Sequence, residues 1–211
     1  MIKPYKISVP KSTLNNIYKK VRSYPWKMMQ NVNGWEYGTN YNYLKKISKY
    51  WVSKYNWKKF ENKINSFKNY KTNVDGINLH FIIQKSKNPK SRPLLLLHGW
   101  PGSVIEFFEI IPRLAHPEKF GGKIEDGFDV IVPSLPGFGF STPIKKALGP
   151  RKIGKILNKF MVKNLGHKNY IVQGGDWGAT IAAWIGLDSA KYCKGIHINC
   201  LPIRHPKGCL L

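Results

Sequence analysis

Apolar residues recur at two different periods along the chain, and the period changes near residue 70. Before that point they repeat every three or four residues, which is typical of one face of a helix. The three stretches concerned are Leu14, Ile17, Tyr18 and Val21, then Leu44, Ile47 and Trp51, then Trp57, Phe60, Ile64 and Phe67. We expect Ser12 or Thr13 to cap the first helix, residues 30–41 to form a loop, and the aromatic stripes to be buried as core.

After residue 70 the pattern predicts buried strands alternating with helices. Asp75-Gly76 is a hairpin turn signal that precedes an alternating strand, and residues 94–97 are four consecutive leucines. Further strands are expected at 128–132, 170–173 and 195–201. Helices are expected after Ser103, with Phe107, Ile110, Ile111 and Leu114 as the apolar face, then from Ile153 to Gly166 and over 179–187.

This alternation predicts a mostly parallel sheet of the α/β class. In such folds ligands bind at the carboxyl ends of the strands. The chemistry is therefore expected in the loops that follow Leu97, Val132 and Gln173.

Charge is the unusual feature of the composition, because 35 basic and 11 acidic side chains give a net charge of +24 over 211 residues. Only five of the basic residues are Arg, the usual side chain for forked phosphate or base contacts, and no nucleic-acid-binding motif is present. These features argue against a nucleic-acid partner. A solvated basic surface is favoured, and contact with an anionic membrane surface is the more plausible partner effect.

The sequence contains no pattern typical of a membrane span, a signal peptide or a metal site. No apolar run approaches the length of a spanning helix, and the first 20 residues lack a hydrophobic signal core. Cys193, Cys200 and Cys209 have neither disulfide nor zinc-ligand spacing, so reduced thiols are expected. We expect no metal and no cofactor.

The strongest local motif is GGDWGA at residues 174–179, between a predicted strand and a predicted helix. It has the form of a nucleophile elbow, with Asp176 as the nucleophile and small neighbours such as Gly175 at the sharp turn. A carboxylate nucleophile suits displacement at an sp³ carbon, giving an ester that water then hydrolyses. The alternative is that Asp176 only caps the helix.

A second motif, HGWPGS at residues 98–103, follows the leucine strand. We expect the backbone N–H groups of Trp100 and Trp177 to form an oxyanion hole. His98, Gly99 and Pro101 are expected to support that loop, Pro101 after a cis bond. His98 as the catalytic base is the less favoured alternative. A third motif, PSLPGFGFS at 133–141, predicts a rigid irregular loop beside the site.

Together with the aromatic residues at 50–57 and the segment 72–81, these motifs resemble the N-terminal part of microsomal-type epoxide hydrolases, including insect juvenile hormone epoxide hydrolases. The resemblance implies an α/β-hydrolase core (residues 71–211) behind a helical N-terminal arm (residues 1–70). It also implies a small lipophilic epoxide as substrate, opened by Asp176, and an endoplasmic reticulum location. Without an anchor in this chain, the cytoplasm is the alternative location.

The chain differs from that family in the residues that hydrolyse the ester intermediate. Family members use a His base, an acidic partner and lid tyrosines, and here only Asp188, His197 and His205 follow Asp176. Asp188 falls in the predicted helix after the elbow and His197 in the last predicted strand, so neither stands at a triad position. We expect a truncated epoxide hydrolase of low or no activity alone. The alternatives are a non-catalytic protein that binds lipophilic ligands or a partner, and another Asp-nucleophile hydrolase such as a haloalkane dehalogenase.

Overall fold

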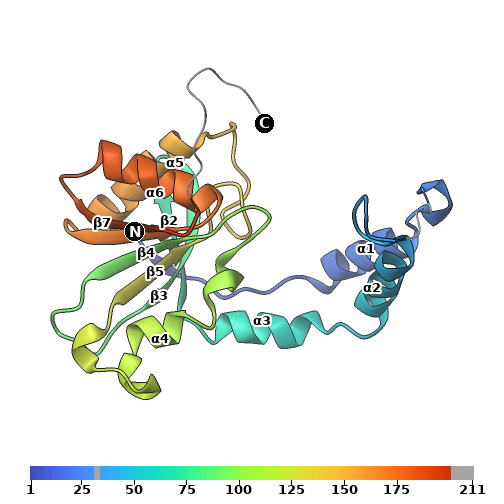
Figure 1. Cartoon of the computed structure of the whole chain (residues 1–211), viewed down its shortest axis with the longest axis horizontal. Coiled ribbons are helices and arrows are strands. Elements are labelled where there is room, and N and C mark those ends of the chain that lie inside the picture. The colour runs from blue at the N-terminus through green and yellow to red at the C-terminus, as the bar shows by residue number, and fades with distance from the viewer. Residues whose placement is uncertain (31–33, 201–211) are drawn as a thin grey trace. The chain divides into compact units, whose positions relative to one another are not determined.

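The computed structural model describes residues 1–30 and 34–200, and it divides into two compact units. One unit is Ile7–Asn65, and the other joins Met1–Lys6 to Ser66–Leu211. Figure 1 labels the elements of both. The expected division at residue 70 between a family arm and a family core stays a prediction.

Within its described residues, the larger unit contains a mixed seven-stranded sheet in the order β1-β2-β3-β5-β4-β6-β7. Its strands are β1 (Lys3–Pro4), β2 (Asn69–Val74), β3 (Ile77–Gln84), β4 (Pro93–Leu97), β5 (Asp129–Pro133), β6 (Tyr170–Gly174) and β7 (Cys193–Ile198). The pairings among β5, β4, β6 and β7 are parallel, and those from β1 to β5 through β2 and β3 are antiparallel. The parallel half carries the strand ends at which the motifs were expected.

The antiparallel half begins with the hairpin at Asp75-Gly76, where both residues have positive φ. Positive φ at both central residues suits the twist of a two-residue hairpin. The two-residue strand β1 then extends the sheet beside β2. The hydrophobic pattern gave no signal for β1, because two residues cannot show a period.

Helices cover both faces of this sheet. The helix α5 (Pro150–Lys159) packs on α6 (Trp177–Asp188), which packs over β4, β6 and β7, and α4 (Ile111–Ala115) packs against β3 and β5. In Figure 1, α5 and α6 lie above the strands and α4 lies below them. The core between these layers is apolar and nearly fully buried, with Leu95, Leu97, Phe160, Val172 and Ile181 among its members.

The helix expected after Ser103 is broken into two pieces. A 3₁₀ turn at Val104–Phe107, closed by the expected capping box of Ser103 and Glu106, precedes α4. Of the expected apolar face, Ile111 is buried, Phe107 and Leu114 are half-buried, and Ile110 is exposed. The other buried side chains are Val104, Phe108 and Ala115, so the expected face was right at Ile111 and wrong at Ile110. The change from a 3₁₀ turn to an α-helix alters the rotation per residue, which a single helical period cannot follow.

The smaller unit is helical, with α1 (Lys11–Arg22), a 3₁₀ turn at Trp26–Met28, α2 (Tyr41–Ser53) and α3 (Trp57–Asn65). The chain before α1 is held to α3 by side chains, since Val9 N–H donates to Glu61 Oε2 at 2.9 Å and Ile7 N–H donates to Asn65 Oδ1 at 2.9 Å. The expected Ser12 or Thr13 cap is wrong. Pro10 stands at the N-cap position of α1, and no side chain caps that helix.

Burial in this unit differs from the expectation. Neither α1 nor α2 has a buried residue, and Ile47, Tyr50 and Trp51 are 43%, 53% and 42% exposed. In α3 the buried residues are Glu61 and Ile64. The helical period was therefore right and the burial of its apolar face was wrong for α1 and α2, because periodicity predicts a face but not what covers it.

Candidate functional site

Asp176 lies at the sharp turn between β6 and α6, where the sequence placed a nucleophile elbow. Its φ is 50° and its ψ is −120°, a conformation that non-glycine residues rarely adopt. Asp176 occupies the N-cap position of α6, but its side chain accepts no hydrogen bond from the helix. The carboxylate therefore does not serve as a helix cap, which removes the structural alternative for this residue.

Two glycines allow the chain to pass through this turn. A Cβ at Gly178 would overlap the carbonyl oxygen of Leu97, at the end of β4. A Cβ at Gly174 would overlap the carbonyl of Gly178. The elbow can therefore lie against the end of β4 only because these positions lack side chains. At Gly175 a Cβ would lie 2.5 Å from Oδ1 of Asn199, which follows β7 and had no distinctive sequence signal.

The loop after β4 brings a backbone donor to the Asp176 carboxylate. The N–H of Trp100 donates to Asp176 Oδ1 at 2.7 Å, and the Trp100–Pro101 bond is cis, as expected. A Cβ at Gly99 would lie 2.7 Å from Cβ and Oδ1 of Asp176. The absence of a side chain at Gly99 thus allows the loop to approach the carboxylate closely.

Trp177 is the residue directly after Asp176 and the first residue of α6. Its backbone N–H makes no hydrogen bond to the carboxylate within the residues that the structure describes, whereas that of Trp100 does. Both indole side chains reach the surface, since Trp100 is 65% and Trp177 37% exposed. Of the two backbone donors named from the sequence, the structure brings one into contact with Asp176.

His98 is fully buried under this loop and both of its ring nitrogens are occupied. Nε2 accepts the N–H of Leu135 at 3.0 Å, so Nδ1 carries the proton and donates to the carbonyl of Gly99 at 2.9 Å. Burial lowers the pKa of His98 and holds the ring neutral. A ring with both nitrogens engaged cannot take a proton from water, so the geometry disfavours His98 as the base and shows it bonded to the loop that it was expected to support.

The acidic residue that follows the elbow, Asp188, is paired with an arginine. Asp188 ends α6 and forms a two-pronged ion pair with Arg151, with both nitrogen–oxygen distances at 2.8 Å. The hydrogen bonds from Arg151 lower the pKa of Asp188. Twelve residues of helix separate it from Asp176, which is about 18 Å at the helical rise.

Of the two histidines that follow the elbow, one falls in the described part of the chain. His197 is an exposed residue of β7, paired in register with Gln173. His205, the other candidate, lies outside the described residues, as does Cys209. Cys193 and Cys200 are free thiols. Among residues 1–30 and 34–200, no three His, Cys, Asp or Glu side chains gather as metal ligands.

Two family models match successive parts of the chain. Residues 2–107 match the family described as "Epoxide hydrolase N terminus", and residues 92–207 match the family described as "alpha/beta hydrolase fold". A putative epoxide hydrolase of Stigmatella aurantiaca is 40% identical over 98% of this chain and 47% of its own length. Epoxide hydrolase 1 of Oryctolagus cuniculus is 36% identical over 94% of this chain and 44% of its own.

A solved structure gives the same result. The juvenile hormone epoxide hydrolase of the silkworm Bombyx mori has a TM-score of 0.80 and 34% identity, and the match covers 94% of this chain and 53% of that one. The chain thus spans about half the length of the relatives that it matches. Since the two family matches together cover nearly all of its residues, the chain belongs to the epoxide hydrolases of the α/β-hydrolase fold.

Proposed function

We propose that this chain opens epoxides through a covalent ester on Asp176. The observation that carries the proposal is the exposed Asp176 carboxylate, which does not cap α6 and accepts the Trp100 N–H at 2.7 Å. Among the residues that the structure describes, no other donor reaches this carboxylate, so its second oxygen is available for attack. An exposed carboxylate oxygen at a strained elbow can approach a strained three-membered ring from outside the core.

In the first step, a carboxylate oxygen of Asp176 attacks one epoxide carbon and the carbon–oxygen bond of the ring breaks. The released alkoxide takes a proton from water, and the product is a hydroxyalkyl ester of Asp176. In the second step, hydroxide adds to the ester carbonyl and the tetrahedral oxyanion collapses to a diol and free Asp176. The backbone N–H groups of Trp100 and Trp177 are the proposed donors to that oxyanion, with His98, Gly99, Pro101 and Gly175 supporting the loops that carry them.

The second step is the one for which this chain is poorly equipped. Hydrolysis of the ester needs an activated water, and His98 has no free ring nitrogen while Asp188 is paired with Arg151. The ester is therefore expected to form and to persist. We expect low or no turnover by this chain alone.

Mass spectrometry after incubation with cis-stilbene oxide, on the intact protein and on its proteolytic peptides, tests the proposal. The expected result is one adduct with the mass of the epoxide, on the peptide that contains Asp176 and absent from Asp176→Ala. Asp188→Asn is the matched control and should still form the adduct. An adduct of equal yield in Asp176→Ala would refute the assignment. Steady diol production by the unmodified chain would refute the expectation of a persistent ester.

The substrate class follows from the relatives. Their names include juvenile hormone epoxide hydrolases as well as general epoxide hydrolases. A small lipophilic epoxide, of hormone or foreign origin, is therefore the proposed substrate. Comparing adduct rates for a terpenoid epoxide and for cis-stilbene oxide distinguishes the two origins.

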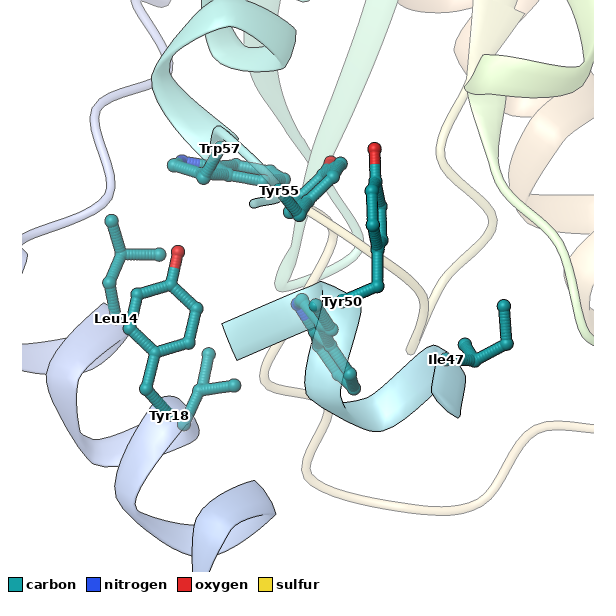
Figure 2. Close-up of a pocket in the computed structure, with 8 residues that line it drawn as sticks. Leu14, Tyr18, Ile47, Tyr50, Tyr55 and Trp57 are labelled. Atoms are coloured by element: carbon teal, nitrogen blue, oxygen red, sulfur yellow. The ribbon is translucent and has the colours of Figure 1, made fainter. Parts of the chain in front are cut away.

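A second candidate function, binding to an anionic lipid surface, is favoured by the helical unit. Its exposed apolar side chains line a groove of about 420 Å³. Figure 2 shows Leu14 and Tyr18 on α1 at one side, Ile47 and Tyr50 on α2 at the other, and Tyr55 and Trp57 at the top of the view, with Tyr50 pointing toward Tyr55. Tyrosine and tryptophan are enriched where proteins meet the headgroup region of a bilayer.

The charge of this unit complements an anionic surface. Residues 7–65 contain twelve basic and two acidic side chains, and Lys54 and Lys58 line a hollow that shares Leu14, Tyr18, Tyr55 and Trp57 with the groove. Basic residues near an anionic bilayer each contribute about 1 kcal/mol to binding. Repulsion between like charges disfavours a second copy of this unit as the occupant. Within residues 1–30 and 34–200, no helix is both long and apolar enough to cross a bilayer.

Sedimentation with vesicles tests this candidate. Phosphatidylserine-containing vesicles should bind the chain, and phosphatidylcholine vesicles should bind it weakly. Trp51→Ser should weaken binding, whereas Leu187→Ser, which removes a still more exposed apolar side chain in the other unit (72% against 42%), should not. Equal binding to both vesicles, or equal loss in both variants, would refute a role for the groove. We propose that such a surface contact holds the chain at the endoplasmic reticulum membrane, with the cytoplasm as the alternative location.

A further inference from the structure

A second buried histidine, His80, is joined by hydrogen bonds to the loops of the proposed site; it lies in the segment 72–81, for which the sequence predicted no catalytic role. His80 is a fully buried residue of β3, and the rings of Tyr5 and Phe140 lie against it at centroid distances of 5.8 and 5.1 Å. Burial, together with the nearby Lys71, lowers the pKa of His80 to about 3, so the ring is neutral at physiological pH. A neutral imidazole offers one donor and one acceptor.

Both ring nitrogens of His80 are used, and their roles are determined by the neighbours. The side-chain nitrogen of Asn69 donates to the carbonyl of Phe67 at 2.8 Å, so its oxygen faces His80 and accepts from Nε2 at 3.0 Å. With the proton on Nε2, Nδ1 accepts the hydroxyl of Ser134 at 2.9 Å. The neutral ring therefore has a single tautomer in this structure.

The backbone of His80 holds the same loop at both ends. Its carbonyl accepts the N–H of Ser134 at 2.9 Å, and its N–H donates to Oγ of Ser141 at 2.9 Å. The Ser141 hydroxyl in turn donates to the carbonyl of Ser134 at 2.7 Å. Both ends of the loop of residues 134–141 are therefore hydrogen-bonded to the backbone of His80 in β3.

This loop reaches the proposed site through the next residue. Leu135 N–H donates to Nε2 of His98, and Nδ1–H of His98 donates to the carbonyl of Gly99. The peptide unit after Gly99 then directs the N–H of Trp100 at Asp176. Hydrogen bonds and short stretches of backbone therefore join His80 to the Asp176 carboxylate without a gap.

We infer that His80 is a positioning residue for the Asp176 site, acting through residues 134–135 and His98 to aim the N–H of Trp100. The inference rests on the proposed function of Asp176. A His that merely fills the core would be replaceable by an apolar ring of similar size. Here the His80 side chain accepts a hydrogen bond from Ser134. The neighbouring residue, Leu135, donates its N–H to His98 Nε2 and so determines the tautomer of His98. In that tautomer His98 Nδ1–H binds the Gly99 carbonyl and keeps it directed away from the carboxylate.

The test uses His80→Phe, which keeps a ring between Tyr5 and Phe140, and Ser134→Ala, which removes only the hydroxyl. Tyr170→Phe is the control, because it removes a buried hydrogen bond of 2.8 Å to Asn158 that has no link to the loop. The readouts are the imidazole nitrogen signals of His98 and the amide proton shift of Trp100, measured by NMR on the folded full chain.

We expect a single Nδ1–H tautomer for His98 in the unmodified chain and in Tyr170→Phe. Both His80→Phe and Ser134→Ala should give a mixture of tautomers and a shifted Trp100 amide proton. Formation of the Asp176 adduct should slow by about tenfold or more, the scale expected for a misplaced reactive group. Ser134→Thr should retain the unmodified signals, because it restores the hydroxyl.

Two outcomes would overturn the inference. One is that His98 and Trp100 keep their signals in both variants. The other is that Tyr170→Phe changes them equally, which would show a general loss of stability instead of positioning. If the unmodified chain forms no adduct at all, the proposed function of Asp176 fails, and the NMR comparison still decides whether His80 positions the loop.

Discussion

The close approach of Gly99 to Asp176 makes Gly99→Ala the most informative single change at the site. A Cβ at this position would lie 2.7 Å from both Cβ and Oδ1 of Asp176 and 3.0 Å from its Cγ. Carbon atoms in contact prefer separations of about 3.5–4.0 Å. The methyl group therefore requires the Asp176 side chain and the loop to move apart by roughly 0.8 Å or more.

A movement of that size is enough to break the contact on which the site depends. The Trp100 N···Oδ1 distance is 2.7 Å, so adding about 0.8 Å brings it to the limit of a hydrogen bond. A hydrogen bond to a charged group contributes about 1.5–3 kcal/mol, and overpacking costs about 1–3 kcal/mol. Because Asp176 is exposed and its carboxylate can turn toward water, we expect a loss of stability near the lower end, about 1–2 kcal/mol.

The assay combines urea unfolding with the rate of adduct formation at Asp176. We expect Gly99→Ala to lower the free energy of unfolding modestly and to reduce the adduct rate strongly. Gly149→Ala is the matched control, since a Cβ there meets nothing within 4 Å and its φ of −80° suits alanine. An adduct rate in Gly99→Ala equal to that of Gly149→Ala would refute the reasoning from this contact.

Three further predictions concern pH, charge and the sheet edge. Because the pKa of His80 falls from 6.5 in the unfolded chain to about 3 when folded, the unfolded state binds more protons between those values and stability falls as the pH drops below 6.5. We expect roughly 2 kcal/mol less stability at pH 5 than at pH 8, and an unchanged urea midpoint would contradict this. Arg151→Ala should leave adduct formation unchanged, because the Arg151–Asp188 pair lies at the far end of α6; a slower adduct rate would implicate the pair in the site. Added salt should promote association of the chain through β7, where Ile196 is 47% exposed on the last strand of the described sheet, and light scattering should show that Ile196→Lys suppresses it.

The elements that local sequence predicted well are those whose causes lie within a few residues. The elbow at Asp176, the hairpin at Asp75-Gly76 and the capping box at Ser103 depend on backbone preferences and short-range hydrogen bonds. So does the strand–helix alternation after residue 70, which follows from the period of apolar residues. These causes are present in the chain before it folds. The sequence therefore predicted the α/β class and the order in which the motifs follow the parallel strands.

Contacts between distant segments decided the rest. Burial of the stripes on α1 and α2 depends on what covers them, and the period alone predicted burial that the structure does not show. The N–H of Trp100 meets a carboxylate 76 residues away, and His80 meets Ser134 across 54 residues. No local pattern encodes such pairs, because a hydrogen bond depends on distances of tenths of an ångström that only the packed sheet establishes.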